Sequence, residues 1–319
     1  QATCAIADGS VYCWGRNDKR QLGAAAPSDS KVPLAMNALH PSGVLVGKTV
    51  TLIEGTAHHF CVIANAAVYC WGDNFYSQLG NGGSALITEP TAVVSTGVVA
   101  GKTPSALATT RDATCAVYSG SAYCWGSAEK GQNGTTVSTN TAREPRAVDA
   151  SGVLNGKTIT AIAGSYFNFC AIASGGAYCW GYNAQGQMGD GVITSPTHAG
   201  YYTPIAFDAT GVLNGKTVTA IVTGATTCVI ASGKVYCSGG STYGTLGNGG
   251  PINDPSSDSA VPVAVTGPLA SKTATALNRG FGTICAAVGT DAYCWGALGD
   301  GSTINSSNSS SIPVKINAP

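Results

Sequence analysis

The chain has 319 residues, a formal net charge of zero at pH 7 and 10% charged residues, against about 25% in an average globular protein. No basic stripe or lysine run is present that would neutralise phosphates, so we expect no nucleic acid or anionic membrane as partner. No stretch of the chain is apolar and long enough to span a bilayer, so we also expect no membrane insertion.

Six pairs of cysteines divide the chain, and the two members of each pair lie nine positions apart. Each pair brackets a motif such as CAIADGSVYC or CVIASGKVYC, which is typical of two short strands joined by a tight turn. No cysteine is left over. In chain order the pairs are Cys4 with Cys13, Cys61 with Cys70, Cys115 with Cys124, Cys170 with Cys179, Cys228 with Cys237, and Cys285 with Cys294.

The spacing also predicts how the sulfurs are joined. If Asp8 and Gly9 form a two-residue turn, Cys4 and Cys13 are cross-strand partners at a non-hydrogen-bonded position, where Cα atoms lie about 4.5 Å apart. This distance allows a disulfide. Zinc is the competing interpretation, but two-cysteine zinc motifs have a shorter CxxC spacing, and the four histidines do not recur with the repeat. We therefore predict six local disulfides, no metal, and an oxidising location outside the cell or at its surface.

Four strand candidates, A to D, recur within each period of 54 to 58 residues. In the fourth repeat they are 158–163, 169–173, 177–180 and 203–207. Nothing in the chain has the pattern of a long amphipathic helix. A ring of four-stranded blades uses these strands and protects their edges. We predict an all-β fold with one β-propeller domain over 1–319, one disulfide per blade, and six repeats centred on the hairpins 4–13, 61–70, 115–124, 170–179, 228–237 and 285–294.

All five tryptophans stand at one position of the repeat, directly after the second cysteine, and the fifth repeat has Ser238 there instead. A large ring at equivalent sites predicts packing between neighbouring blades, where it excludes the most water. A ring of ligand-binding tryptophans is the alternative.

The full repeat consists of a CAI-type strand, VYCWG, a loop of NxxGQLGNG character, PVAV and GVLxGKTVTAI. This combination resembles the repeat of the regulator of chromosome condensation family, most closely the cysteine-containing versions found in exported bacterial proteins. The resemblance covers essentially the whole chain and implies a propeller. Because members of this family include an exchange factor, protein inhibitors and surface proteins, the resemblance implies no single function.

Two features depart from the better-known members of this family. Those members resemble seven-bladed rings, whereas six hairpins are present here. The array also begins at strand B, because only three residues precede Cys4, so five A strands accompany six hairpins. The first blade is therefore short, or its strand lies in residues not included, or another chain donates the strand, which would make the protein a polymerising subunit.

Alternating strand directions place the B–C turns and the GVLxGKT segments on one face, and the A–B and C–D loops on the other. Rings that gather in the loops of the second face are candidate contacts for a protein or glycan surface, unless they fold back over the blade tops. They are His58, His59, Phe75, Tyr76, Tyr166, Phe167, Tyr182, Tyr201, Tyr202, Tyr243 and Phe281.

The opposite face carries a lysine in five equivalent turns, where the side chain either attracts an anionic polymer or is a solvated turn residue. These lysines are Lys48, Lys102, Lys157, Lys216 and Lys272.

No motif for nucleophilic or metal-assisted catalysis is present, and the cysteines are committed to bridges, so we expect no enzyme, no catalytic residue and no cofactor. Asn133, Asn305 and Asn308 begin glycosylation sequons. We expect a secreted or cell-surface binding or adhesion module, or an extracellular structural subunit. The alternatives are a filament subunit completed by a donated strand, or a soluble inhibitor or lectin.

Overall fold

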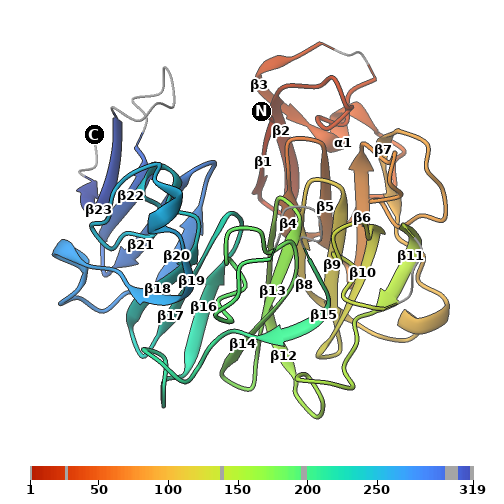
Figure 1. The fold of residues 1–319 in the computed structure, drawn as a ribbon. Helices are drawn as coiled ribbons and strands as arrows, with labels where there is room; N and C mark the ends of the chain where they lie inside the picture. The colour runs from red at the N-terminus through yellow and green to blue at the C-terminus, as the bar shows by residue number, and fades with distance from the viewer. Residues whose placement is uncertain (1, 26–27, 137–139, 195–199, 299–307, 317–319) are drawn as a thin grey trace.

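The computed structural model describes residues 2–25, 28–136, 140–194, 200–298 and 308–316. Within them, antiparallel strands form six sheets that stand as blades around a ring (Figure 1). Five sheets have four strands each, and the first has three. The predicted propeller is confirmed, and the first blade lacks its A strand as the sequence indicated.

The first three blades are built in chain order from strands A to D, except that blade 1 begins at B. Blade 1 is β1 (Ala2–Ala7), β2 (Ser10–Gly15) and β3 (Ser30–Ala35), followed by the short helix α1 (Met36–Leu39). Blade 2 is β4 (Val50–Gly55), β5 (His59–Ala64), β6 (Ala67–Gly72) and β7 (Ile87–Ala92), followed by the 3-10 helix η1 (Gly97–Val99). Blade 3 is β8 (Pro104–Thr109), β9 (Ala113–Tyr118), β10 (Ser121–Ser127) and β11 (Thr141–Ala147).

The last three blades follow the same order. Blade 4 is β12 (Ile159–Ser165), β13 (Asn168–Ala173), β14 (Gly176–Gly181) and β15 (Tyr201–Ala206). Blade 5 is β16 (Val218–Val222), β17 (Thr226–Ala231), β18 (Lys234–Gly239) and β19 (Ser259–Ala264), with the 3-10 helices η3 (Thr242–Gly244), η4 (Pro255–Ser257) and η5 (Gly267–Leu269) around β19. Blade 6 is β20 (Ala276–Arg279), β21 (Thr283–Val288), β22 (Asp291–Ala297) and β23 (Ser309–Ile316).

The two middle strands of each blade pair in the predicted register. In blade 1, Ala7 faces Ser10 across the turn and Cys4 faces Cys13. Asp8 and Gly9 both have positive φ, 49° and 72°, as a type I′ turn requires. The turn chemistry thus sets the register, and the register brings the sulfurs together.

All six predicted disulfides are present, one in each blade, with Cα–Cα distances of 4.0 to 4.1 Å. Every bridge joins the partners that the spacing predicted. Cys4 is bonded to Cys13, Cys61 to Cys70, Cys115 to Cys124, Cys170 to Cys179, Cys228 to Cys237, and Cys285 to Cys294.

The hydrophobic core is divided into five clusters, and each lies between two consecutive blades. In each cluster the cysteine-bearing face of one blade meets the opposite face of the next blade. For example, Cys61 and Cys70 of blade 2 pack with Trp125 and Tyr123 of blade 3. The predicted role of the tryptophans in packing between blades is therefore confirmed.

The buried tryptophans also form hydrogen bonds across these junctions. Trp71, Trp125, Trp180 and Trp295 are each 0% exposed. Their indole nitrogens donate to loop carbonyls of the preceding blade over 2.8 to 3.0 Å; the acceptors are those of Gln21, Gln78, Gln132 and Thr245. Pairing of this kind satisfies the one polar group that a buried tryptophan carries.

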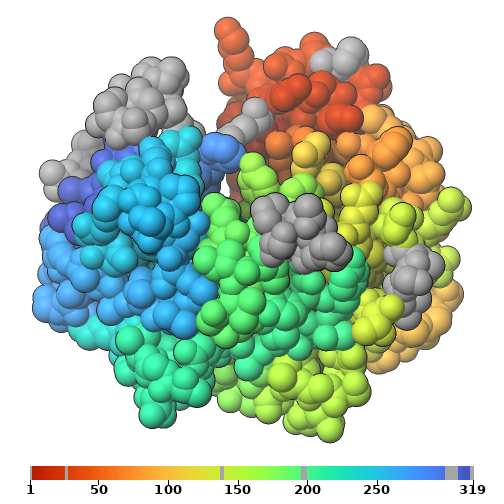
Figure 2. Space-filling view, viewed as in Figure 1, coloured from red at the N-terminus to blue at the C-terminus, as the bar shows by residue number. Residues whose placement is uncertain are grey.

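The junction between blade 6 and blade 1 differs from the other five. No core cluster of the described residues joins these two blades, and Trp14 of blade 1 is only half-buried. The space-filling view shows the first blade, in red, and the last, in dark blue, on the two sides of this junction (Figure 2). We call this junction the seam.

Candidate functional site

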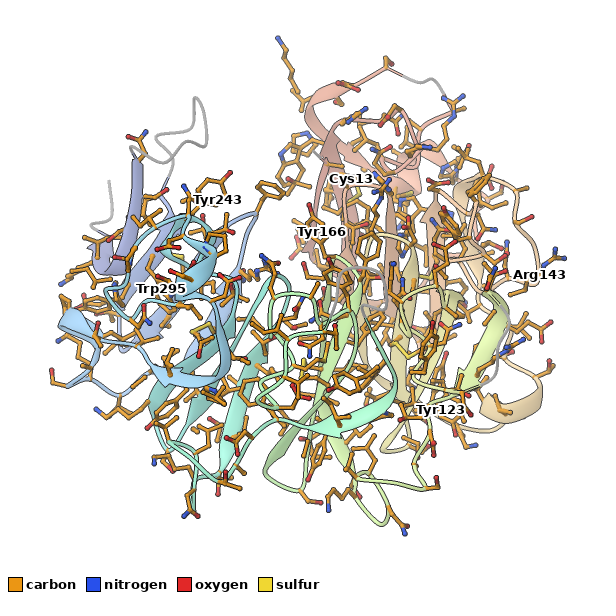
Figure 3. All side chains as sticks on the ribbon, viewed as in Figure 1. Cys13, Tyr123, Arg143, Tyr166, Tyr243 and Trp295 are labelled. Carbon is orange, nitrogen blue, oxygen red and sulfur yellow. A yellow bond between two sulfur atoms is a disulfide. The ribbon has the colours of Figure 1, made fainter. Side chains whose placement is uncertain are left out.

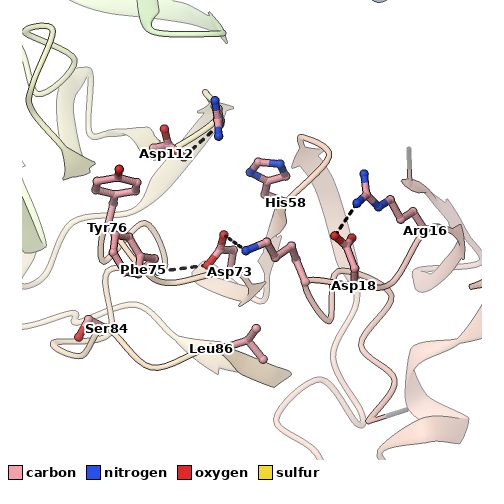
Figure 4. Close-up of a pocket in the computed structure, with 11 residues that line it drawn as sticks. Arg16, Asp18, His58, Asp73, Phe75, Tyr76, Ser84, Leu86 and Asp112 are labelled. Atoms are coloured by element: carbon pink, nitrogen blue, oxygen red, sulfur yellow. Dashed lines mark hydrogen bonds and ion pairs between the residues drawn. The ribbon is translucent and has the colours of Figure 1, made fainter. Parts of the chain in front are cut away.

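A cleft of about 540 Å³ opens on the face formed by the A–B and C–D loops. It lies over blades 1, 2 and 3 (Figure 4). Its lining comes from the C–D loops of blades 1 and 2 and the A–B loops of blades 2 and 3, which is the face on which the sequence placed the variable loops. The lining residues are Arg16, Asp18, Lys19, His58, Asp73, Phe75, Tyr76, Ser84, Leu86, Arg111 and Asp112.

Charges of both signs are paired along the cleft. Arg16 lies 2.7 Å from Asp18, Lys19 lies 3.4 Å from Asp73, and Arg111 lies 3.7 Å from Asp112. The three cations are 41 to 60% exposed, whereas Asp73 and Asp112 are only 13% and 12% exposed. Exposed pairs of this kind contribute little to stability. They present a mixed pattern of donors and acceptors, suited to a partner with mixed charge.

His58 stands among these charges and is held neutral. Burial, reinforced by the Arg111 charge, lowers the pKa of His58, and its Nδ1 is buried without a hydrogen-bond partner. Burial also raises the pKa of Asp112, although Arg111 opposes the shift. The cleft therefore offers polar contacts and an imidazole whose uncharged form is favoured.

Two aromatic clusters occupy the loop face. Phe75 is 73% exposed and meets Tyr76 edge to face, with ring centroids 5.0 Å apart, at the rim of the cleft. Tyr166, Phe167 and Tyr182 form a second chain of edge contacts on blade 4, with centroids 5.7 and 6.2 Å apart. The structure therefore gathers some of the predicted rings, but in two separate groups.

The remaining predicted rings lie elsewhere. Tyr201 donates to Asp190, and Tyr202, which is 50% exposed, is 3.5 Å from the Glu129 carbonyl; both are on β15. Phe281 is 53% exposed on blade 6. Figure 3 labels Tyr166 and Tyr243, which belong to different blades. No single aromatic platform is formed by the described residues.

His59 differs most from its expected position. Its side chain is 0% exposed, and its Nε2 lies 2.9 Å from the Thr114 hydroxyl of blade 3. Burial lowers the pKa of His59 to about 3. The first residue of β5 points into the blade junction, so His59 is a packing residue and is not presented to a ligand.

The three sequons also differ in their surroundings. The Asn133 side chain is 1% exposed, and its amide lies 3.4 Å from the Gly126 carbonyl, so in the folded chain it is not open to a transferase. Asn308 is half-buried just before β23. Asn305 lies outside the described residues.

Sequence reasoning missed the charged half of the cleft. Asp73 and Asp112 each stand at the edge of a middle strand, and Arg16, Lys19 and Arg111 are in loops. Single charges in loops resemble ordinary solvated residues in a sequence. Of these five, only Arg16 and Asp73 stand at equivalent positions of neighbouring repeats, three residues after the second cysteine, so the repeat pattern does not mark the others.

On the opposite face, the five repeated lysines are not merely solvated. Each ammonium group lies 5.2 to 5.9 Å from the centroid of the strand-C tyrosine of its own blade. The pairs are Lys48 with Tyr69, Lys102 with Tyr123, Lys157 with Tyr178, Lys216 with Tyr236, and Lys272 with Tyr293. A cation over a ring face is attracted by the ring quadrupole. Each contact joins the segment that leads into an A strand to strand C of the same blade.

In the described ranges, no group of three His, Cys, Asp or Glu side chains is placed to hold a metal ion. None of the helices in those ranges has the length and apolarity that crossing a bilayer requires.

Comparison with known proteins agrees with the repeat structure. Residues 8–63 match the family model of the regulator of chromosome condensation (RCC1) repeat. The E3 ubiquitin-protein ligase HERC2 of Mus musculus is 32% identical over 196 residues, which is 61% of this chain and 4% of HERC2. The ultraviolet-B receptor UVR8 of Arabidopsis thaliana is 26% identical over 255 residues, 77% of this chain and 52% of the receptor.

Among solved structures, Prp20p of Saccharomyces cerevisiae superimposes with a TM-score of 0.78 at 18% identity, covering 99% of this chain and 75% of Prp20p. That likeness concerns the fold. The chain spans about half of UVR8 and a small part of HERC2, so the activities of those proteins are not assigned to it. The family model matches the repeat at residues 8–63, and the relatives and the fold agree with that match, so the repeat of this chain is of the regulator of chromosome condensation type.

Proposed function

We propose that this propeller is a non-enzymatic binding module of an oxidising, extracellular compartment, and that it holds a protein partner in the cleft over blades 1 to 3. The observation that carries the proposal is the cleft itself, which is lined by charges of both signs and by the aromatic pair Phe75 and Tyr76. These side chains are on loops between strands of blades that each contain a disulfide. Loops on a rigid scaffold bind without a large loss of entropy. Aromatic side chains and arginine are also the residues enriched in protein interfaces.

The location is supported by the disulfides. Six bridges with no free cysteine are typical of proteins that fold in an oxidising compartment. Among the solved structures, the one of Prp20p is described with binding to Gsp1p and histones, which supports the view that propellers of this shape present surfaces to other proteins.

A binding experiment with matched variants tests the proposal. The disulfide-intact protein is screened against arrays of extracellular proteins and of glycans, together with a double variant that combines Phe75→Ala and Tyr76→Ala. Phe281→Ala, which removes an exposed ring from blade 6, is the control. We expect protein ligands that bind the wild type and the control but lose most of their affinity for the double variant. Binding only to glycans, or protein binding that the double variant leaves unchanged, would contradict the proposal.

A second function, the subunit of an extracellular filament, is favoured by one specific observation. The first sheet has three strands where the others have four, so within the described part of the chain the outer edge of β1 is unpaired, and such an edge can accept a strand from another chain. Electron microscopy of concentrated native protein distinguishes the two functions, since a filament subunit forms fibres and a soluble module stays as single rings.

A further inference from the structure

The open edge of β1 has a defined set of hydrogen-bonding groups. Because Cys4 and Cys13 form a non-hydrogen-bonded pair, the backbone groups of Cys4 and Ile6 point away from β2. In blade 5 the equivalent residues Cys228 and Ile230 pair with Val222 and Ala220 of strand A. No described residue takes that place beside β1.

The difference is visible in burial. Strand B, the second strand of the repeat, is buried at every residue in blades 2 to 5, whereas no residue of β1 is fully buried. Strand β21 of blade 6, which has its A strand, has two buried residues of six, so burial is lowest on the two sides of the seam. An edge strand with exposed backbone groups is a template for pairing. The five complete blades also show what kind of segment belongs there.

The first contact of that segment is the lysine over the strand-C tyrosine. It is repeated in five blades. Tyr12 is the sixth tyrosine of the set, and no described lysine lies over its ring.

The second contact is made by the turn of the same blade. The amide of Thr49 donates to Asn65 Oδ1 over 3.0 Å, and that of Thr103 to Ser119 Oγ over 3.4 Å. Both acceptors occupy the first turn position, where blade 1 has Asp8. A carboxylate there accepts the same amide and also complements the neighbouring lysine charge.

The third contact is made by the turn of the preceding blade. The residue after the threonine donates its amide to a turn carbonyl over 2.9 Å in four junctions. These bonds are Val50 to Gly9, Ile159 to Gly120, Val218 to Gly175 and Ala274 to Gly233. The corresponding carbonyl of blade 6 is that of Thr290, on the far side of the seam. A segment that makes all three contacts therefore bridges blade 6 to blade 1.

We propose that the seam binds an extended segment of another chain with the sequence Gly-Lys-Thr followed by alternating aliphatic residues, and that this segment becomes the A strand of blade 1. Its lysine lies over Tyr12, its threonine amide bonds Asp8, and the next amide bonds Thr290. The five segments of this type in the chain are each engaged in their own blade, so the occupant comes from outside the residues that the structure describes. The inference deepens the filament function and rests on it.

A peptide of the chain's own sequence tests the site directly. Residues 210–222, TGVLNGKTVTAIV, are synthesised with a fluorophore and titrated into the disulfide-intact protein. We expect saturable binding at one site, a raised Tm, and slower hydrogen exchange at the amides of Cys4 and Ile6. In the peptide, Lys216→Ala should weaken binding about two- to fivefold, the effect of one exposed cation–π contact. Ala220→Pro, which removes the amide facing Ile6, should abolish binding.

Matched variants of the protein locate the peptide. Asp8→Asn, which copies the turn of blade 2, should keep the affinity, whereas Asp8→Gly, which copies the turn of blade 6, should lower it. Tyr12→Leu should weaken binding and Tyr236→Leu, in a blade that already has its lysine, should not.

Absence of saturable binding, or an affinity that Asp8→Gly and Tyr12→Leu leave unchanged, would overturn the inference. Peptide binding by a protein that never forms fibres would remove the filament function and leave the strand site standing.

Discussion

The junction between blades 2 and 3 and the seam between blades 6 and 1 are built from the same repeat. They differ in how deeply the repeated tryptophan is buried and in whether an A strand lies beside strand B. At the first junction Trp125 is fully buried and donates to Gln78, and a complete A strand, β8, covers β9. At the seam Trp14 is half-buried and β1 has no described strand on its outer side. The comparison teaches that each blade buries its core residues against its neighbour, so a blade without a closed junction loses that burial.

The largest expected difference concerns the tryptophans. Trp125→Ala removes a buried ring and should lower the free energy of unfolding by about 3 to 5 kcal/mol. Trp14→Ala, at the seam, should cost about 1 kcal/mol because much of its ring is already in contact with water. Urea denaturation of both variants measures the difference, and equal losses would show that the seam is as well packed as the junction.

Removing a disulfide should lower the free energy of unfolding by less than removing a buried tryptophan. The bridges at the closed junctions and at the seam should again behave differently. Replacing Cys115 and Cys124 by serine should cost about 2 to 3 kcal/mol, the value for a short closed loop. In partial reduction, the bridges next to the seam should open first, because Cys4 and Cys285 are half-buried whereas both cysteines of the bridges in blades 2 to 5 are 0% exposed. Mass spectrometry of alkylated peptides reads the order; random reduction of all six bridges would argue against an open seam.

Acid should lower the free energy of unfolding through His59, which lies in the closed junction between blades 2 and 3. Its pKa is about 3 in the folded protein and about 6.5 in the unfolded chain. Since only the unfolded state takes up a proton in this interval, stability falls as the pH drops below about 6.5, by about 2 kcal/mol at pH 5. His59→Asn copies Asn168, which stands at the same register position in blade 4, and should remove this share of the pH dependence. If the stability of the His59→Asn variant depended on pH as that of the wild type does, groups other than His59 would cause the acid sensitivity.

The smallest effect is expected from the lysines that lie over tyrosines. Lys102→Ala removes an ammonium group 5.2 Å from the Tyr123 ring centroid and should lower stability by about 0.5 to 1 kcal/mol. Lys130→Ala, a loop lysine of the same blade outside this set, is the control and should change stability by less. Thermal unfolding of the pair decides whether the lysines hold the lead-in segments.

Much of the fold was predictable because it depends on local rules that repeat. The turn pair Asp8 and Gly9 sets the hairpin register, and the register alone places Cys4 opposite Cys13. The packing of the tryptophans followed from their equivalent positions. Strand bounds in blade 4 agreed with the expected ranges to within two residues.

The site was harder to predict because it depends on contacts between repeats. His59 looked like a loop residue, but β5 begins one residue earlier than the motif suggested and turns the imidazole into the junction with Thr114. The cleft combines single charges such as Lys19, Asp73 and Arg111 from three blades, and nothing in one repeat marks them as neighbours. The lysine–tyrosine contacts join the segment before strand A to the third residue of strand C, and spacing alone does not show that these are neighbours.

The central claim is that, in the described part of the chain, five junctions are closed by a core cluster and the seam is open. Native-state hydrogen exchange tests this claim most directly. The account predicts that the amides of Cys4 and Ile6 exchange orders of magnitude faster than those of Cys115 and Val117, their counterparts in blade 3. Equal protection of the two pairs in the isolated protein would contradict it.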